Sequence, residues 1–312
     1  MANRVVYWNG SFISETEARV SIFDSALMFG DMVFEMTRTF GQKTFRLREH
    51  LERLYASLDY VEIDCGLTID EMESATLETI ERNLPELEAL DFQVMHDVTR
   101  GAGSLYDTLV KEGTEPLVSI NTLPLVRHLA GVSAHYAQGA HLVITPQQAI
   151  PARYIDPKAK NRSRLHYQLA NLHASRLEPG AMALLLDERG FVAEGTGSNV
   201  FIARDGEVLT PKPHDILRGV SRRACIDYAA SIGISVREVD LDPYDVRAAD
   251  EVWITSTPFA MLPVTRFDFR PVGDGTPGEI FIRILDTWSE EVGVNIAAQA
   301  EEYGKLAETW SP

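Results

Sequence analysis

The chain has 312 residues, of which 45% are hydrophobic and 24% charged, and these proportions are ordinary for a globular protein. This length exceeds what one hydrophobic core usually supports, so we expect two domains. The net charge of −17 disfavours nucleic acids and membranes as partners, because phosphate backbones and lipid surfaces are also negative.

The sequence shows neither a membrane span nor a signal peptide. No apolar run approaches the roughly 20 residues of a transmembrane helix, and Met1-Ala2-Asn3-Arg4 leads directly into a polar-apolar strand. Cys65 and Cys225 are the two cysteines, and we interpret both as reduced and buried. We therefore expect a soluble, cytoplasmic protein without a metal site.

The first 125 residues carry signals for both strands and helices. Asn9-Gly10, between two short apolar runs, is a strong signal for a two-residue hairpin. Thr68 and Glu71 form a capping box, which predicts a helix that runs to about Asn83. The expected strands are 5–8, 11–13, 33–40, 43–45, 92–99 and 117–123, and the expected helices are 48–58 and 69–83.

The remainder of the chain is richer in strands. Residues 126–138 lack clear periodicity, and we interpret them as an interdomain loop. The expected strands are 140–145, 182–186, 191–194, 199–203 and 207–209, and the expected helices are 164–176, 220–232 and 279–292. Because these elements do not alternate regularly, we predict an α+β fold, with a small α/β domain (1–125) followed by a larger domain (139–312) built on a barrel-like, largely antiparallel sheet.

Lys160 is the most informative residue of the chain because of the motifs that follow it. An amine that bonds to an aldehyde and then moves a proton needs a fixed scaffold, and a predicted helix begins shortly after Lys160. Most lysines, however, are solvated surface residues. Lys158 is a competitor two positions away, and in an extended segment both side chains point to the same side. Spacing alone therefore does not choose between them.

Glu194 ends an apolar strand, where a buried charge is costly unless it is paired. A buried carboxylate beside a pyridine nitrogen favours the protonated form of that nitrogen. Gly195 and Gly197 allow the backbone to approach a ligand closely. The commoner alternative is an exposed glutamate at the end of a strand.

Two segments have the composition of phosphate-binding turns. Gly219-Val220-Ser221 opens a predicted helix, whose first N–H groups could bind an anion. Thr255-Ser256-Thr257 offers three hydroxyls after an apolar strand, and Arg53 could add a positive charge, although a surface salt bridge is its commoner role. An amine, a carboxylate and two anion-binding turns are the groups needed to hold and use pyridoxal 5′-phosphate.

Taken in this order, the motifs resemble the class IV aminotransferases, which are fold-type IV pyridoxal-phosphate enzymes. That family includes branched-chain and D-amino-acid aminotransferases, (R)-selective amine transaminases and aminodeoxychorismate lyases. The resemblance covers nearly the whole chain. The segments that carry it are 7–10, 29–35, 48–54, 155–161, 194–199, 218–222, 249–252 and 255–257.

The resemblance implies a role for several of these residues. It makes Lys160, rather than Lys158, the lysine that forms the Schiff base with the cofactor. It also implies a homodimer in which loops of one subunit complete the active site of the other, acting on an amine or amino acid and a 2-oxo acid. The remaining cofactor residues are Glu194 at the pyridine nitrogen, and Arg53, Gly219, Val220, Ser221 and Thr257 at the phosphate.

Departures from the family's patterns bear on the substrate. Met36 stands where branched-chain enzymes usually have the glycine of Phe-Glu-Gly. Thr99-Arg100-Gly101 is similar to the D-amino-acid enzymes, but Leu105-Tyr106-Asp107 replaces their Arg-x-His pair. Residues 149–161 resemble the (R)-selective amine transaminases. We predict an (R)-amine or D-amino-acid donor, with a branched-chain L-amino acid as the alternative and the lyase as a less favoured one.

A substrate carboxylate also needs a cation in the pocket. Strand alternation places Phe34, Met36 and Arg38 on one face, and a guanidinium can bind a carboxylate through two hydrogen bonds. Pairing of Arg38 with a structural acid is the alternative. Arg127, in the interdomain segment, is a second candidate cation, and we also assign Phe29 to the substrate pocket.

Overall fold

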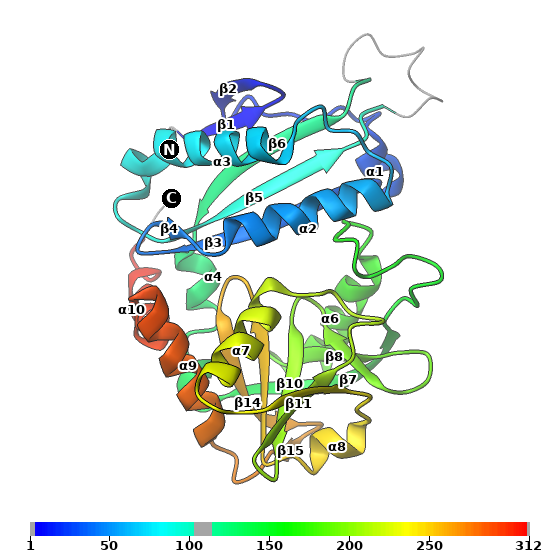
Figure 1. The fold of residues 1–312 in the computed structure, drawn as a ribbon, viewed down its shortest axis with the longest axis vertical. Helices are drawn as coiled ribbons and strands as arrows, with labels where there is room; N and C mark the ends of the chain where they lie inside the picture. Colours follow the sequence, from blue (N-terminus) through cyan, green and yellow to red (C-terminus); the bar gives the residue numbers. More distant parts are fainter. Residues whose placement is uncertain (1–3, 103–113, 311–312) are drawn as a thin grey trace. The chain divides into compact units, whose positions relative to one another are not determined.

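The computed structural model describes residues 4–102 and 114–310, and the chain divides into two compact units (Figure 1). Unit 1 comprises Met1–Val126, Ala159–Ser163 and Trp310–Pro312. Unit 2 comprises Arg127–Lys158 and Arg164–Thr309. The stretch from Ala159 to Ser163, which the sequence analysis placed in the second domain, therefore packs with unit 1.

Unit 1 is built on a six-stranded sheet in the order β2-β1-β6-β5-β3-β4, and its neighbouring strands are antiparallel. The predicted hairpin is confirmed, since Asn9 and Gly10 have φ values of 44° and 83° between β1 and β2. The strands are β1 (Val5–Trp8), β2 (Ser11–Ser14), β3 (Met32–Phe40), β4 (Lys43–Thr44), β5 (Phe92–Thr99) and β6 (Leu117–Pro124).

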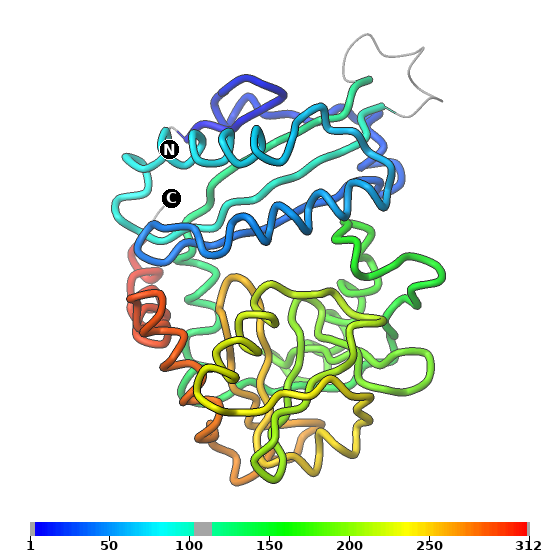
Figure 2. Tube along the Cα trace, in the orientation of Figure 1, coloured from blue at the N-terminus to red at the C-terminus, as the bar shows by residue number. Residues whose placement is uncertain are grey.

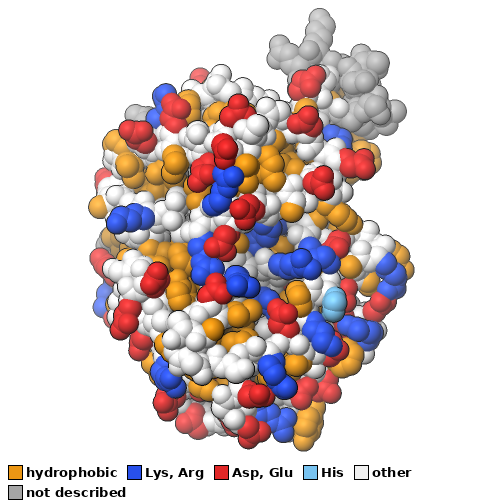
Figure 3. Space-filling view, in the orientation of Figure 1, with side chains coloured by type: hydrophobic (Ala, Val, Ile, Leu, Met, Phe, Trp, Pro, Cys, Tyr) orange, Lys and Arg blue, Asp and Glu red, His pale blue; other side chains and the backbone are white. Residues whose placement is uncertain are grey.

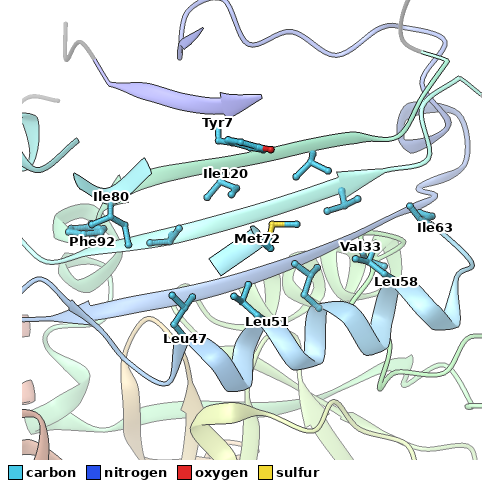
Figure 4. Close-up of a cluster of buried hydrophobic side chains, with 14 of the residues drawn as sticks. Tyr7, Val33, Leu47, Leu51, Leu58, Ile63, Met72, Ile80, Phe92 and Ile120 are labelled. Carbon is cyan, nitrogen blue, oxygen red and sulfur yellow. The ribbon is translucent and has the colours of Figure 1, made fainter. Parts of the chain in front are cut away.

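Helices cover one face of this sheet. The two long ones, α2 (Leu47–Tyr60) and α3 (Ile69–Asn83), were both predicted, and the capping box of Thr68 and Glu71 opens α3. Short helices α1 (Ser25–Phe29) and η1 (Leu84–Leu87) complete the unit. Leu51 and Leu54 of α2 are fully buried in the hydrophobic core of unit 1, and each stabilises the fold by about 1.5–3 kcal/mol. Figure 4 shows Leu51 in this core.

Residues 159–163 extend the same sheet at the edge of β3. Asn161 forms a bridge with Val33, and the backbone N–H of Phe34 donates to the carbonyl of Lys160 over 3.0 Å. The N–H of Arg162 donates to the carbonyl of Met32 over 3.3 Å. This short segment thus has the backbone partners of a strand and is fixed to β3.

Unit 2 contains a nine-stranded sheet that curls into a half-barrel, which confirms the predicted barrel-like α+β architecture. The sheet is mixed, because three of its strand pairs (β11–β12, β14–β7 and β7–β8) are parallel. The strands are β7 (Ala140–Gln148), β8 (Met182–Leu186), β9 (Val192–Gly195), β10 (Asn199–Arg204), β11 (Glu207–Pro211), β12 (Val236–Val239), β13 (Glu251–Ser256), β14 (Ala260–Phe267) and β15 (Arg270–Pro271).

The segment 126–138 is helical in part, so the prediction of a loop there was wrong. It contains α4 and α5, and the tube in Figure 2 shows the chain winding through it. The helices assigned from here to the end of the chain are α4 (Val126–Ala130), α5 (His135–Gln138), α6 (Leu165–Leu177), α7 (Val220–Ser231), α8 (Pro243–Arg247), α9 (Glu279–Val292) and α10 (Ile296–Leu306).

Both cysteines are free thiols. Cys225 is buried and lies 3.4 Å from the indole nitrogen of Trp253, and burial raises the pKa of its thiol to about 12. Cys65 is only half-buried, although burial was expected for both. Within residues 4–102 and 114–310, none of the helices has the length and apolar character needed to cross a membrane.

Candidate active site

Lys160 is held by backbone contacts on both sides within unit 1. Its N–H donates to the hydroxyl of Ser57 on α2 over 3.0 Å, and its carbonyl accepts from Phe34. The ammonium nitrogen lies 4.6 Å from the centroid of the Phe34 ring. The scaffold of this amine within unit 1 is therefore the edge of β3 together with α2.

Lys158 has a different environment, in unit 2. Its ammonium nitrogen lies 2.8 Å from a carboxylate oxygen of Asp156 and donates to the carbonyl of His214 over 3.0 Å. The Lys158 amine is thus already engaged by a carboxylate and a carbonyl within unit 2. These contacts favour Lys160 over Lys158 as the reactive amine.

Glu194 is a buried carboxylate at the end of β9, with 4% of its surface exposed. One oxygen accepts from the hydroxyl of Tyr167 over 2.7 Å, and the other accepts from the backbone N–H of Leu217 over 2.9 Å. Burial and the charge of Glu194 hold the pKa of Tyr167 well above its usual value, so that hydroxyl stays protonated and donates. The site can therefore hold a negative charge in a buried position.

Asn199 connects Glu194 to the turn before α7. Its amide nitrogen lies 3.2 Å from Glu194 and donates to the carbonyl of Leu217 over 3.0 Å. A Cβ atom at Gly219 would lie 2.2 Å from the amide oxygen of Asn199, so this close approach requires a glycine. Neither Asn199 nor Tyr167 was predicted from the sequence as a site residue. Asn199 is the last residue of the motif that begins at Glu194, and its place in that motif could have pointed to it. Tyr167 is 27 positions from Glu194 in the sequence, so the sequence held no comparable signal for it.

The N-terminus of α7 and the end of β13 provide groups for an anion. Gly219 caps the helix with extended backbone and no side-chain hydrogen bond, while Val220 and Ser221 are buried at its first positions. The hydroxyl of Thr255 is buried without a hydrogen-bond partner among the described residues. Unused donors at a helix N-terminus and an orphan buried hydroxyl fit a phosphate group. Thr257 follows the same strand, two residues on.

Arg53 forms an ion pair inside unit 1. Its guanidinium donates to both carboxylate oxygens of Glu35, over 2.8 and 2.6 Å, and 11% of its side chain is exposed. Burial opposes ionisation of Glu35, but Arg53 and His50 hold the pKa of its carboxyl well below the usual range. The structure thus gives Arg53 a structural acid as a partner, and its assignment to the cofactor phosphate stays a prediction.

Arg38 is enclosed within unit 1, with 1% of its surface exposed. Its Nε donates to the carbonyl of Thr39 over 3.0 Å, and its guanidinium carbon lies 3.8 Å from the centroid of the Phe40 ring. These contacts direct the guanidinium along β3 rather than into solvent.

The other predicted substrate residues lie in varied surroundings. Phe34 is buried and Met36 half-buried on β3, whereas Phe29 on α1 is 69% exposed. Arg127 is exposed on α4. The stretch 105–107, which stands in place of the Arg-x-His pair, lies outside the described residues.

A further cation beside Phe34 was missed by the sequence analysis. The guanidinium carbon of Arg162 lies 3.6 Å from the centroid of the Phe34 ring, and its Nη2 lies 3.1 Å from a carboxylate oxygen of Asp97. Arg162 follows Lys160 by two positions, so alternation along an extended segment could have pointed to it.

Comparison with known proteins gives consistent matches along the chain. The family model described as "Amino-transferase class IV" matches residues 32–267. A putative branched-chain-amino-acid aminotransferase of Methanocaldococcus jannaschii is 34% identical over 286 residues, which cover 91% of this chain and 95% of that protein. A D-alanine aminotransferase of Staphylococcus epidermidis is 29% identical over 277 residues, which cover 88% of this chain and 93% of that protein.

Solved structures of branched-chain amino acid aminotransferases have a fold similar to that of this chain. A branched-chain amino acid aminotransferase complexed with N-(5′-phosphopyridoxyl)-L-glutamate matches with a TM-score of 0.82 and 29% identity, covering 96% of each chain. The branched-chain enzyme of Escherichia coli matches with a TM-score of 0.82 and 26% identity, covering 92% of this chain and 94% of that one.

Proposed function

Because the chain belongs to the class IV aminotransferases, we propose that it exchanges an amino group between an amine or amino acid and a 2-oxo acid, with Lys160 as its catalytic amine. The enzyme is a transaminase, and its cofactor is pyridoxal 5′-phosphate. This cofactor supplies an electron sink that allows the donor to lose its α-proton. The observation that carries the proposal is the position of Lys160, which is held at the edge of β3 with its amine over Phe34.

Lys160 has two roles in this proposal. Its amine would hold the cofactor through the aldehyde group, and the same nitrogen would serve as the base that carries the proton lost by the donor. The hydrogen bonds of its backbone to Phe34 and Ser57 fix the point from which the side chain starts, beside the Phe34 ring.

Glu194 would lie at the pyridine nitrogen of the cofactor and would favour its protonated form. Its buried carboxylate accepts from Tyr167, Asn199 and Leu217, and these donors hold it in one orientation while stabilising its negative charge. A cationic ring nitrogen beside it would complete the charge balance of this buried site.

The cofactor phosphate is assigned to the N-terminus of α7. The backbone N–H groups of Val220 and Ser221 would donate to it, and Thr257 would add a hydroxyl. Arg53 would add positive charge, beyond its present pairing with Glu35.

For the donor, our first candidate is a D-amino acid or an (R)-amine, which is supported by relatives named D-alanine aminotransferase at 29–30% identity. A branched-chain L-amino acid is the second candidate, and it is favoured by the relative from M. jannaschii and by the solved structures. Alanine and the branched-chain amino acids are all aliphatic, and the apolar ring of Phe34 beside Lys160 suits either class.

Spectra of the cofactor-loaded enzyme against a donor panel test this function. D-alanine, L-leucine and the two enantiomers of 1-phenylethylamine would each be mixed with the enzyme in the absence of a 2-oxo acid. We expect one donor class to abolish the absorption band of the lysine-bound cofactor, and its identity assigns the donor. A spectrum that no donor changes, or pyruvate released from aminodeoxychorismate without an amino acceptor, would contradict the transaminase.

We further propose a cytoplasmic homodimer in which the two subunits share their active sites. Exposed apolar side chains on unit 1, including Ile22 (73% exposed), Leu27 (64%) and Phe29 (69%), support an interface. The free thiols of Cys65 and Cys225 are compatible with a reducing compartment.

A further inference from the structure

Arg162 and Lys160 share one aromatic ring in unit 1. The two residues lie two positions apart on the segment paired with β3, so their side chains project to the same side of the sheet. The centroid of the Phe34 ring lies 3.6 Å from the guanidinium carbon of Arg162 and 4.6 Å from the ammonium nitrogen of Lys160. Any group that reacts at Lys160 therefore lies close to a second cation.

The partners of Arg162 leave much of its guanidinium available. Within the described part of the chain, Asp97 is the one carboxylate within ion-pair distance, and it is reached by Nη2 alone. The same nitrogen also lies 3.2 Å from the sulfur of Met95. The side chain is 35% exposed, and its contacts to Asp97 and Met95 use fewer than the five N–H donors of a guanidinium.

Charge around Phe34 favours an anion. Two basic side chains, Lys160 and Arg162, contact the Phe34 ring, and within the described part of the chain Asp97 is the carboxylate that pairs with Arg162. Asp97 lies directly across from Phe34 in the register of β3 and β5, and burial raises the pKa of its carboxyl despite the opposing effect of Arg162. Asp97 is thus a counter-ion, held by one nitrogen of Arg162, that a ligand carboxylate could replace.

The chemistry of the proposed reaction identifies such a ligand. A 2-oxo acid carries its carboxylate on the carbon that reacts, so that carboxylate comes within a few ångströms of the catalytic amine. Arg38, the cation predicted from the sequence, is enclosed and lies over Phe40. Arg162 is partly exposed and lies beside Lys160.

We propose that Arg162 binds the α-carboxylate of the 2-oxo acid, and of an amino-acid donor, by exchanging its bond to Asp97 for one to the substrate. This inference rests on the proposed function, because it takes Lys160 to be the reacting amine. The guanidinium fork can present two parallel N–H groups to the incoming carboxylate, whereas it gives Asp97 one. Asp97 acts here as a positioning residue that holds Arg162 ready in the absence of substrate.

The first test replaces Arg162 by methionine, which retains the apolar stem over Phe34 without the charge. Loss of a charge-assisted, bidentate contact should raise the KM for pyruvate about 10- to 100-fold while kcat changes much less. R162K should be intermediate, because it keeps the charge but loses the fork. The matched control is Arg48→Met, since Arg48 is an exposed arginine of unit 1 paired with Asp70 and Glu73.

A second readout is independent of turnover. Calorimetry of the cofactor-loaded protein would give dissociation constants for 4-methylpentanoate and its neutral amide. R162M should weaken binding of the acid about 10- to 100-fold and leave the amide within about two-fold. D97N should tighten binding of the acid about 2- to 5-fold, because the competing carboxylate is gone, whereas a purely structural pair predicts weaker binding.

These results separate the two proposals. Donor-panel spectra of the wild-type enzyme that show no reaction would overturn the proposed function, and the calorimetry would still test Arg162. A wild-type enzyme that transaminates, with an R162M variant whose KM for pyruvate and affinity for 4-methylpentanoate both stay within two-fold, would overturn the role of Arg162 alone.

Discussion

Gly219 shows how one missing side chain shapes the proposed cofactor site. It lies where the turn before α7 approaches Asn199, and Asn199 in turn contacts Glu194. The sequence indicated a phosphate-binding turn, and the structure adds a steric reason for its glycine. The turn, the amide and the carboxylate therefore form one connected arrangement.

Substitution of Gly219 by alanine should displace Asn199 and so disturb the orientation of Glu194. We expect the affinity for pyridoxal 5′-phosphate to fall at least about 10-fold, since a hydrogen bond to a charged group is worth about 1.5–3 kcal/mol. Gly131→Ala is the matched control, because its added Cβ would make only ordinary contacts, at 3.6 Å or more. Equal cofactor dissociation constants for the two variants would contradict this account.

Residue-level prediction from the sequence was possible where a motif was local and was not possible where a contact was long-range. Lys160 and Glu194 could be singled out because each stands in a recognisable run of neighbours. Tyr167 and Asp97 could not, because their partners lie 27 and 65 positions away in the sequence. Strand alternation also could not show that the guanidinium of Arg38 contacts Phe40 and Thr39 of its own strand.

The capping box at the start of α3 is a local element that the sequence predicted fully. The hydroxyl of Thr68 accepts from the N–H of Glu71, and the carboxylate of Glu71 accepts from the N–H of Thr68. Thr68→Ala should cost about 1 kcal/mol, or about 2–4 °C in melting temperature. Ser74→Ala in the same helix is the control, because Ser74 is exposed and caps nothing. Scanning calorimetry should show a lower melting temperature for Thr68→Ala than for Ser74→Ala. Equal melting temperatures would contradict the prediction.

His96 on β5 makes the stability of unit 1 dependent on pH. Burial lowers its pKa from 6.5 to about 4. Between these two pH values the unfolded state therefore binds a proton at His96 more readily than the folded state does. The contribution of His96 to the free energy of unfolding is complete above about pH 6.5 and is lost as the pH falls towards 4. The free energy of unfolding should be lower by about 3 kcal/mol at pH 4 than above pH 6.5 because of this one group.

Urea unfolding at pH 7.5 and 4.5 measures this effect. The free energy of unfolding should fall more steeply with acidification in the wild type than in a His96→Gln variant, whose side chain does not titrate. The hydrogen bond of His96 to Thr76 is short, at 2.8 Å, and glutamine retains a polar partner for it. An identical pH dependence in both proteins would show that His96 does not contribute.

Element prediction failed where elements were short or their sequence was atypical. α4 and α5 have five and four residues, too few for a helical period to appear. β14 was not predicted either, and it carries Pro263 in its interior, which argues against a strand within a sheet. Longer elements such as α2 and β3 were predicted to within two residues at each end.

At the scale of the whole molecule, the chain is acidic, but its surface carries side chains of both charges. The chain carries a net charge of −17, yet basic and acidic side chains are interspersed on the face shown in Figure 3. Such a surface resists non-specific association. A specific apolar interface is therefore needed for the proposed homodimer.

Analytical ultracentrifugation of the cofactor-loaded enzyme should give a mass of about twice the chain's 34.8 kDa. Replacement of the exposed Leu27 by glutamate should shift the protein towards the monomer, because a charge buried in an interface without a partner is costly. Glutamate at Tyr244, which is exposed in unit 2, is the control. A wild-type enzyme that sediments as a monomer at all concentrations would refute the dimer.

Covalent mapping of the cofactor tests the account most directly. The cofactor-loaded enzyme would be reduced with borohydride, digested, and its labelled peptide sequenced by mass spectrometry. The account predicts the phosphopyridoxyl mass on Lys160. A label on Lys158, or on no lysine of the chain, would contradict it.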